Sequence, residues 1–417
     1  MDKRTIMDRV QAERDNMIRE RRYLHQHPEL SGEEMETCAY IAAQLRGLGL
    51  EVHEVPPGGV IGLLGGHIRK PAILLRADID ALPIQESSRN LSCARTCISQ
   101  VPGKMHACGH DAHTAMLLCA ARILAEDPPD VPVLFVFEEG EENNSGILTL
   151  LPYLDAHFHI GACYATHVRW DIPAGQFGIC PGTAMSGGFG FKIELRGRSG
   201  HGSRPDMAAS PIDCFTQIHT RLMMLRMTEA EPDQVLTYSV GSVHAGQVTN
   251  IIPETLLFTG TVRTYDSARA GERFAAAMRA IVVETAASFG CEATFLHFPR
   301  LLYETSNDPV MRERFLSAVR TLVPEVQVED VKPWMASETM SAYLKWWPGV
   351  LSFTGVRNEE KGCGAGHHTP EFDLDEDALA TGVAAALAVV ADWERSPAEV
   401  PDGFRGETLP SLLERKL

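Results

Sequence analysis

The sequence lacks long hydrophobic runs, and its basic residues are outnumbered by acidic ones. None of its apolar stretches approaches the roughly 18 consecutive residues that a membrane-spanning helix needs. The opening segment, Met1–Arg9, is charged where a signal peptide would turn apolar, so we expect a cytoplasmic protein without a membrane partner. Lys and Arg number 38 against 55 Asp and Glu, a formal net charge of −17. Such a surface would repel nucleic acid and acidic membranes, which favours a small-molecule substrate.

The lack of an export signal also affects how the ten cysteines are interpreted. In a reducing compartment thiols stay unpaired, and each is then available for packing or for binding metal. The length of 417 residues exceeds what one hydrophobic core usually organises, so we expect two domains.

Outside its middle third, the chain alternates short apolar runs with segments of helical periodicity. The apolar runs cover residues 60–64, 72–77, 131–137, 162–168 and 349–353. Helical periodicity covers residues 1–26, 33–48, a stretch after Asp111, 310–322 and 375–393. This alternation predicts an α/β fold with a parallel or mixed sheet covered by helices.

The middle of the chain has a different rhythm, which predicts an inserted domain at residues 187–299. Its strands and helices follow in the order Phe189–Leu195, Pro211–Met227, Val235–Val243, Leu256–Thr264, Ala268–Phe289 and Ala293–Phe298. This βαββαβ order is typical of a ferredoxin-like sandwich. The first domain is therefore predicted to be discontinuous, formed by residues 1–186 and 300–417.

The segment Met105–His113 contains one thiol, three imidazoles and a carboxylate, all side chains that bind metals. In an irregular turn Cys108 and His110 can both face one point, whereas on a helix they would diverge by about 200°. Gly109 between them allows the backbone to make that turn. The alternative is a thiol that packs beside helix-capping histidines.

An acidic run, Glu138–Glu142, directly follows the apolar strand Val133–Phe137. Sheets of this type place their ligand crevice at the strand ends, and carboxylates held that close raise one another's pKa unless a cation neutralises them. The alternative is a solvated acidic surface.

Two more histidines occupy similar positions. His167 follows the apolar residues 162–166, and His368 follows a glycine-rich segment. Asp78 and Asp80 end another strand, from which they could orient metal ligands. Together these residues provide donors for one or two ions, recruited from separate segments at one sheet edge.

These motifs resemble a known family. The motifs are Arg76–Pro83, Met105–His113, Glu141–Glu142, Gly200–Gly202, Val248–Pro253 and Gly260–Arg263. They resemble the aminoacylase and carboxypeptidase group of co-catalytic metallopeptidases. More narrowly, they look like the hippurate hydrolase and indole-acetyl-amino-acid hydrolase branch, in which a cysteine replaces a usual metal ligand. The resemblance extends from Arg21 to about Trp393, and the cysteine motif is its most specific part.

The resemblance implies roles for nine residues. The implied ligands of two divalent metal ions are Cys108, His110, Glu142, His167 and His368. Zinc is expected, with manganese, cobalt or nickel as alternatives, because a mixed donor set suits several first-row ions. Glu141 would be the catalytic base.

The implied substrate contacts lie in the inserted domain, which the resemblance makes a lid and dimerisation domain. His201 would stabilise the oxyanion, and Asn250 and Arg263 would bind the substrate carboxylate. Some of these contacts would cross a dimer interface, so we expect a homodimer or a higher homo-oligomer.

The chain departs from the family pattern at several positions. It has Glu138-Glu139-Gly140 where relatives usually read Gln-Pro-Ala, which leaves Glu138 and Glu139 as alternative bases. It has Glu338-Thr339-Met340 where relatives carry Glu-Asp-Phe, and Asp206 where a second histidine is usual. We expect altered substrate recognition and not lost catalysis, because every implied ligand position is filled.

The predicted function is metal-dependent hydrolysis of the amide bond of an N-acyl amino acid. Three alternatives stay open. The first is a dipeptidase or carboxypeptidase of the same family, the second is a catalytically silent metal-binding homologue, and the third is an enzyme that uses a serine or cysteine nucleophile such as Cys108.

Overall fold

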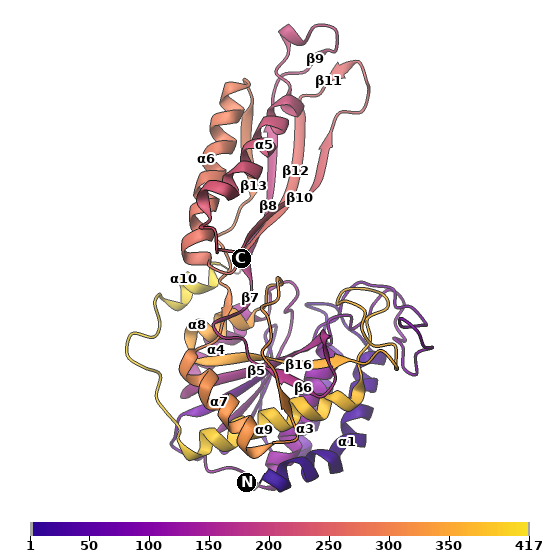
Figure 1. Ribbon diagram of the computed structural model, residues 1–417, viewed down its shortest axis with the longest axis vertical. Helices are drawn as coiled ribbons and strands as arrows, with labels where there is room; N and C mark the ends of the chain where they lie inside the picture. Colours follow the sequence, from indigo (N-terminus) through magenta and orange to yellow (C-terminus); the bar gives the residue numbers. More distant parts are fainter. Residues whose placement is uncertain (1–2, 416–417) are drawn as a thin grey trace. The chain divides into compact units, whose positions relative to one another are not determined.

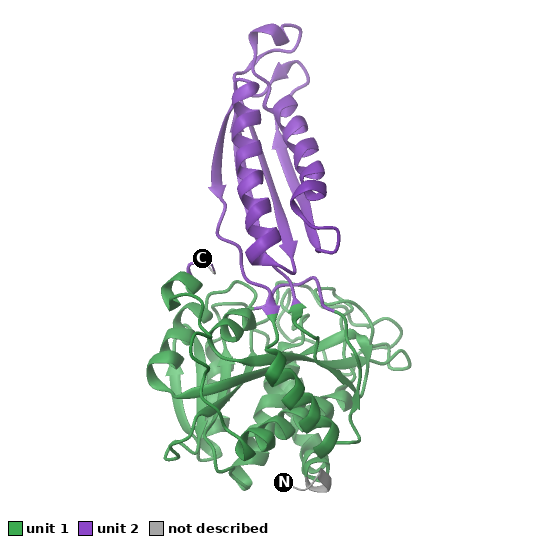
Figure 2. Cartoon of the chain, turned by 60° about the vertical axis from the view of Figure 1, so that its left-hand side comes forward, with its two compact units in different colours: residues 1–184, 306–332, 339–413 green, residues 185–305, 333–338, 414–417 purple. Residues whose placement is uncertain are grey.

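The structure is a computed structural model that describes residues 3–415 (Figure 1). Its contacts divide the described chain into two compact units (Figure 2). Unit 1 comprises residues 3–184, 306–332 and 339–413, and unit 2 comprises 185–305, 333–338 and 414–415. The predicted boundaries of the insert, 187 and 299, lie a few residues inside the main segment of unit 2, 185–305. The short segment 333–338, which returns to unit 2, carries no signal in the hydrophobic pattern.

Unit 1 is built on a mixed eight-stranded sheet with the order β1-β2-β4-β3-β5-β16-β6-β15. In that order the strands are Glu51–Val55, Gly59–Leu64, Val133–Glu138, Ala72–Asp78, Ile160–Pro173, Gly349–Arg357, Gln176–Gly178 and Gln327–Val328. The four central strands, β4, β3, β5 and β16, run parallel to one another, whereas β1 and β2 pair antiparallel. The predicted mixed α/β architecture is therefore confirmed.

Strands β3 and β4 are buried along their whole length, because helices cover both faces of this sheet. The helices of unit 1 are α1 (Lys3–Gln26), α2 (Met35–Gly47), α3 (His110–Glu126), α4 (Ile147–His157), α7 (Pro309–Leu322), α8 (Met340–Trp346), α9 (Leu379–Arg395) and α10 (Leu409–Leu413). Helices α1, α3, α7 and α9 pack together over one face, where Ile73 and Leu75 of β3 join their core (Figure 1). Helix α8 contacts β5 and β16.

Unit 2 contains the predicted βαββαβ order. Its main elements are β8 (Gly187–Arg196), α5 (Pro211–Glu229), β10 (Leu236–Ala245), β12 (Thr255–Thr264), α6 (Glu272–Ser288) and β13 (Glu292–His297). The strands form an antiparallel sheet with the order β10-β12-β8-β13. Every second residue of β8 is buried, and Phe191, Ile193 and Leu195 pack in one core with the apolar faces of α5 and α6. A small pair, β9 (Gly200–His201) and β11 (Ile251–Ile252), completes the unit.

The parallel strands fix where chemistry can occur in unit 1. The polar residues that follow β3 and β4 emerge at the same edge of the sheet, because the carboxyl ends of parallel strands meet there. Among residues 3–415, no helix combines the length and the apolar character that crossing a lipid bilayer requires.

Candidate metal centre

All five predicted metal ligands lie in unit 1 and come together. They are supplied by four segments: Cys108 and His110 by the start of α3, Glu142 by the loop after β4, His167 by β5 and His368 by the loop after β16. Three groups of donors each have their atoms within 4.8 Å of one another: Cys108 with His110 and His167, Cys108 with Glu142 and His368, and His110 with Glu141 and Glu142. Cys108, His110 and Glu142 each belong to two of these groups, so the groups form one continuous cluster.

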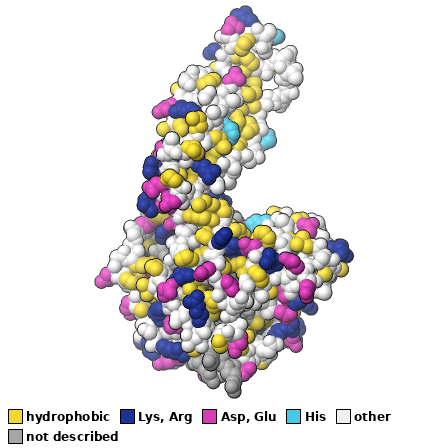
Figure 3. All heavy atoms as spheres, viewed as in Figure 1, with side chains coloured by type: hydrophobic (Ala, Val, Ile, Leu, Met, Phe, Trp, Pro, Cys, Tyr) yellow, Lys and Arg dark blue, Asp and Glu magenta, His cyan; other side chains and the backbone are white. Residues whose placement is uncertain are grey.

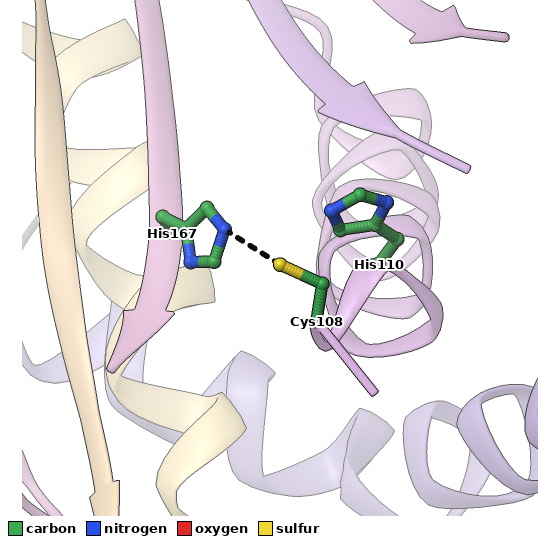
Figure 4. Close-up of side chains that lie close together, drawn as sticks. All are labelled: Cys108, His110 and His167. Atoms are coloured by element: carbon green, nitrogen blue, oxygen red, sulfur yellow. Dashed lines mark hydrogen bonds between the residues drawn. The ribbon is translucent and has the colours of Figure 1, made fainter. Parts of the chain in front are cut away.

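The shortest contacts show how close these side chains are. The Cys108 Sγ atom lies 3.6 Å from Nε2 of His167 (Figure 4). Nε2 of His368 lies 3.2 Å from Oε1 of Glu142. Figure 4 shows Cys108 between the rings of His110 and His167, with its sulfur directed toward His167. The thiol therefore lies among several donors from separate segments, which favours the metal site over a cysteine that only packs beside helix-capping histidines.

The turn at Gly109 aims Cys108 and His110 at the same point. Its φ is +92°, a left-handed conformation that glycine adopts without strain. A Cβ atom at this position would lie 2.4 Å from Cγ2 of Val168, the residue after His167. The close approach of the two segments therefore requires glycine for space as well as for backbone conformation.

Two aspartates from the end of β3 and the residues just after it orient the ligands, as their position predicted. Asp80 accepts a hydrogen bond at 2.9 Å from Nδ1 of His110 and another at 3.0 Å from the backbone N–H of Glu142. Asp78 interacts at 2.6 Å with Nδ1 of His113, whose Nε2 accepts from the N–H of Val168 at 2.9 Å. Such partners fix the tautomer and the direction of a metal-binding imidazole.

The electrostatics of the cluster fit a cation. Burial, reinforced by the charge of Glu142, raises the pKa of the Cys108 thiol well above its usual value. Burial and the nearby His113 lower the pKa of His167 well below its usual value. Nε2 of His110 is buried and makes no hydrogen bond within the described chain, while its Nδ1 is held by Asp80. A divalent ion would use that lone pair and would stabilise the thiolate.

More negative charge surrounds the same edge. The carboxylate of Glu34 is buried and accepts a hydrogen bond at 2.7 Å from the N–H of Gly140. Burial raises the pKa of Glu34 to about 7, against the effect of that N–H and with a contribution from Asp80. Carboxylates crowded in this way favour bound cations.

Of the acidic residues considered as bases, only Glu141 lies with the ligands. Its Oε1 accepts a hydrogen bond at 3.0 Å from the N–H of Thr339. Glu138 is fully buried on β4 and accepts from Nε of Arg76 at 2.8 Å. Glu139 accepts from the thiol of Cys38 at 2.9 Å. The proposal of Glu138 or Glu139 as a substitute base is therefore wrong, because both carboxylates are bound elsewhere.

The three predicted substrate contacts belong to unit 2. His201 is exposed on β9, where its Nδ1 interacts with the hydroxyl of Ser203 at 2.8 Å. Asn250 is exposed beside it, and its carbonyl accepts from the N–H of Gly202 at 2.8 Å. Arg263 is half-buried on β12 with Nη1 3.2 Å from the hydroxyl of Ser337.

Within unit 2 these three residues do not form one group. Thr255, the first residue of β12, lies just beyond β11 and so marks the His201 and Asn250 end of the sheet. Arg263 is eight residues further along the same strand, a distance of about 26 Å at 3.3 Å per residue. The expectation that Asn250 and Arg263 of one copy bind the same carboxylate therefore does not hold within this unit.

Sequence reasoning missed three residues of the site: Arg76, His113 and Thr339. His113 stood in the cysteine motif without an assigned role, and Arg76 stood in the strand before the two aspartates. Thr339 was noted only because it departs from the resembled Glu-Asp-Phe pattern, and no role was predicted for it. Its backbone contact with Glu141 depends on tertiary structure alone.

The comparisons with known proteins agree with this geometry. The model of the peptidase family M20/M25/M40 matches residues 74–392. The chain belongs to this family. It is therefore a hydrolase, and the resemblance in its motifs is confirmed. The match covers β4, β5, β16 and most of β3, and it covers all of residues 185–305, the longest segment of unit 2.

Curated relatives are similar over most of their length. The chain is 33% identical to thermostable carboxypeptidase 2 of Saccharolobus solfataricus, over 89% of this chain and 93% of the relative. It is 31% identical to IAA-amino acid hydrolase ILR1-like 4 of Arabidopsis thaliana, over 88% and 83%. It is 33% identical to N-acetyl-L-cysteine deacetylase of Bacillus subtilis, over 86% and 83%.

A solved structure supports a two-metal centre. The YXEP protein of Bacillus subtilis, described as a dinuclear metal-binding peptidase of the M20 family, superposes with a TM-score of 0.76 at 31% identity. The match covers 91% of this chain and 99% of that protein. Together with the donor groups of unit 1, this likeness supports two divalent ions.

A glycine substitution tests the geometry of the centre. We expect Gly109→Ala to lower metal content and to cost about 1–3 kcal/mol in stability, because the added methyl group would overlap Val168 beside His167. The matched control is Gly103→Ala, since Gly103 also has positive φ, +77°, but nothing within 4 Å of its Cβ position. Metal content by mass spectrometry and unfolding midpoints check this. Equal effects of the two substitutions would contradict the steric argument.

Proposed function

We propose that this protein hydrolyses the amide bond of N-acyl amino acids, with two divalent ions held by Cys108, His110, Glu142, His167 and His368 and with Glu141 as the general base. The observation that carries the proposal is the convergence of these donors from four separate segments. Glu141 shares one donor group with His110 and Glu142, and its carboxylate also accepts a hydrogen bond from the backbone N–H of Thr339, the residue before α8.

Glu141 would act on the attacking water and on the leaving amine. Divalent ions in such a site lower the pKa of a coordinated water and stabilise negative charge on the substrate. Glu141 is buried beside the ligands and would accept the proton of the attacking water, then deliver it to the amine nitrogen. His201 would donate to the oxyanion, and Arg263 and Asn250 would bind the carboxylate of the amino acid.

The identity of the metal follows from the donor set only in part. One thiolate, three imidazoles and one carboxylate suit zinc, which we propose as the native ion. Manganese, cobalt and nickel also bind such sets, and the ion that the cell supplies decides among them.

The names of the relatives favour an acylated amino acid as substrate. Two of the curated relatives are named for acyl-amino-acid substrates, N-acetyl-L-cysteine deacetylase and IAA-amino acid hydrolase. The third, a carboxypeptidase, is the observation that supports peptide trimming as the second candidate function. A cysteine nucleophile is disfavoured, because the Cys108 thiol is buried among ligand donors and its pKa is raised.

Unit 2 supports a role in pairing two copies of the chain. Because His201 and Asn250 lie at the Thr255 end of β12, about 26 Å from Arg263, one copy cannot present all three residues to one substrate. We propose that a second copy supplies His201 and Asn250. Helix α5 exposes Met223, Met224 and Met227, and β10 is an open sheet edge, both of which suit association. Figure 3 shows apolar side chains on the viewed face of unit 2.

A substrate panel with one inactivating substitution tests the reaction. We expect the metal-loaded enzyme to cleave N-acetyl, benzoyl or indole-acetyl amino acids faster than dipeptides. Glu141→Gln should keep both metal ions and lower kcat by about 10²–10⁴-fold, because the base is lost while the ligands remain. The matched control, Glu139→Gln, makes the same chemical change on a residue outside the cluster and should stay near wild type. Near wild-type turnover of Glu141→Gln would refute its role.

Mixed dimers test the proposed exchange of residues between copies. Glu141→Gln and His201→Ala chains should each be inactive alone. Co-expressed at equal levels, they should recover about one quarter of wild-type activity, because half of the dimers are mixed and each has one intact site. If His201 acts within its own copy, every site keeps one defect and activity stays at the level of the single variants.

A further inference from the structure

One buried guanidinium joins two of the positions at which the chain departs from the resembled motifs. Arg76 lies on β3, and its side chain is 2% exposed. Its Nε donates to Oε2 of Glu138 at 2.8 Å, and its Nη1 donates to Oδ2 of Asp78 at 2.8 Å. Its Nη2 donates to the hydroxyl of Thr339 at 2.6 Å. Glu138 and Thr339 are thus partners of the same cation.

The charges around Arg76 are all removed from water. The side chains of Asp78 and Glu138 are 1% and 0% exposed, and Thr339 is fully buried. A buried guanidinium is stable only when carboxylates balance it and its N–H groups are bound. Asp78 is shared with His113, so Glu138 provides the second carboxylate that faces Arg76.

The same group reaches Glu141 through Thr339. The hydroxyl of Thr339 accepts from Arg76, while its backbone N–H donates to Oε1 of Glu141. One helical turn further, the hydroxyl of Tyr343 donates to Oε2 of Glu138 at 3.0 Å. The start of α8 is therefore attached at two points, because residues four apart lie on one helical face.

We infer that Arg76, Glu138 and Thr339 form a charge-balanced support that positions the carboxylate of Glu141, and that the carboxylate at position 138 is what permits a neutral residue at position 339. Thr339 is then a positioning residue, which acts through its backbone on the base. The two positions contact one cation, so a carboxylate at position 339 should be able to replace the one at position 138, and we call this replacement the exchange. The positioning of Glu141 rests on the proposed function, whereas the exchange itself does not.

A double-substitution cycle on the metal-loaded full chain tests the exchange. Glu138→Gln removes a carboxylate that faces Arg76, and Thr339→Asp adds a carboxylate to the same pocket. We expect each alone to lower the folding constant by on the order of tenfold to a hundredfold. Glu138→Gln takes the carboxylate from Nε of the buried Arg76, and Thr339→Asp adds a buried negative charge. The combined variant should recover most of the loss, since the carboxylate then faces Arg76 from position 339.

The readout is the urea midpoint followed by tryptophan fluorescence. Four of the five tryptophans lie in unit 1, at positions 170, 346, 347 and 393, so the signal reports mainly the unit that contains Arg76. Glu139→Gln is the matched control and should leave the midpoint unchanged. If Thr339→Asp alone fails to fold, recovery of soluble protein in the combined variant supports the exchange. Additive losses, or failure of the combined variant to fold, would overturn it.

The positioning of Glu141 has a separate test. Thr339→Val removes the hydroxyl that holds Arg76 and should lower kcat by about tenfold with KM and metal content unchanged, because the base loses its orientation and the ligands do not. Thr339→Ser keeps the hydroxyl and should restore kcat. An unchanged kcat, or a loss of metal in step with kcat, would overturn the positioning role. If the chain has no amidase activity at all, the proposed function fails, while the stability cycle still decides the exchange.

Discussion

Ionisable groups crowd the edge of unit 1's sheet where β3 and β4 end, and a cation must balance them. A thiol, several imidazoles and several carboxylates are buried there. The charged form of each loses its contact with water, which costs free energy unless an opposite charge lies nearby. The raised pKa of Cys108 and the lowered pKa of His167 are two expressions of that cost. Bound divalent ions remove it, and the parallel strand order, the Gly109 turn and the supporting aspartates all hold the donors in position for them.

The supporting residues divide into two systems that meet at β3. Asp80 ties His110 to the backbone of Glu142, so two ligands from different segments share one carboxylate. Asp78 contacts His113, which in turn accepts a hydrogen bond from the backbone N–H of Val168, next to His167. Asp78 also accepts a hydrogen bond from Arg76. Asp80 therefore supports His110 and Glu142, whereas Asp78 is shared between the His113 contact and Arg76. A change at the base can leave the ligands in place, which makes the two functions separable by experiment.

The sequence allowed the sheet, the βαββαβ order and the gathering of donor side chains at one sheet edge to be predicted, because these follow from short-range patterns. Cys108 and His110 lie in one motif, and strand periodicity put the other donors at strand ends. The acidic run was harder, since five adjacent residues gave no sign of which carboxylate faces the ligands. That choice is made by partners far along the chain: Arg76 for Glu138 and Cys38, 101 residues away, for Glu139. The contact of Arg76 with Thr339 spans 263 residues and left no local pattern.

Glycines near His201 show how tertiary contacts can reverse a local interpretation. Three glycines flank this residue, and a flexible loop is one interpretation of them. Gly197, however, lies where a Cβ atom would come within 2.1 Å of the carbonyl oxygen of Ala209, so close backbone approach accounts for it. The β9–β11 pairing likewise ties His201 to the segment that carries Asn250. His201 is thus held on a paired strand at one end of unit 2, with Arg263 at the other end of β12. A sheet of fixed strand length cannot bend these ends together, so within unit 2 His201 and Arg263 stay apart whatever the side chains do.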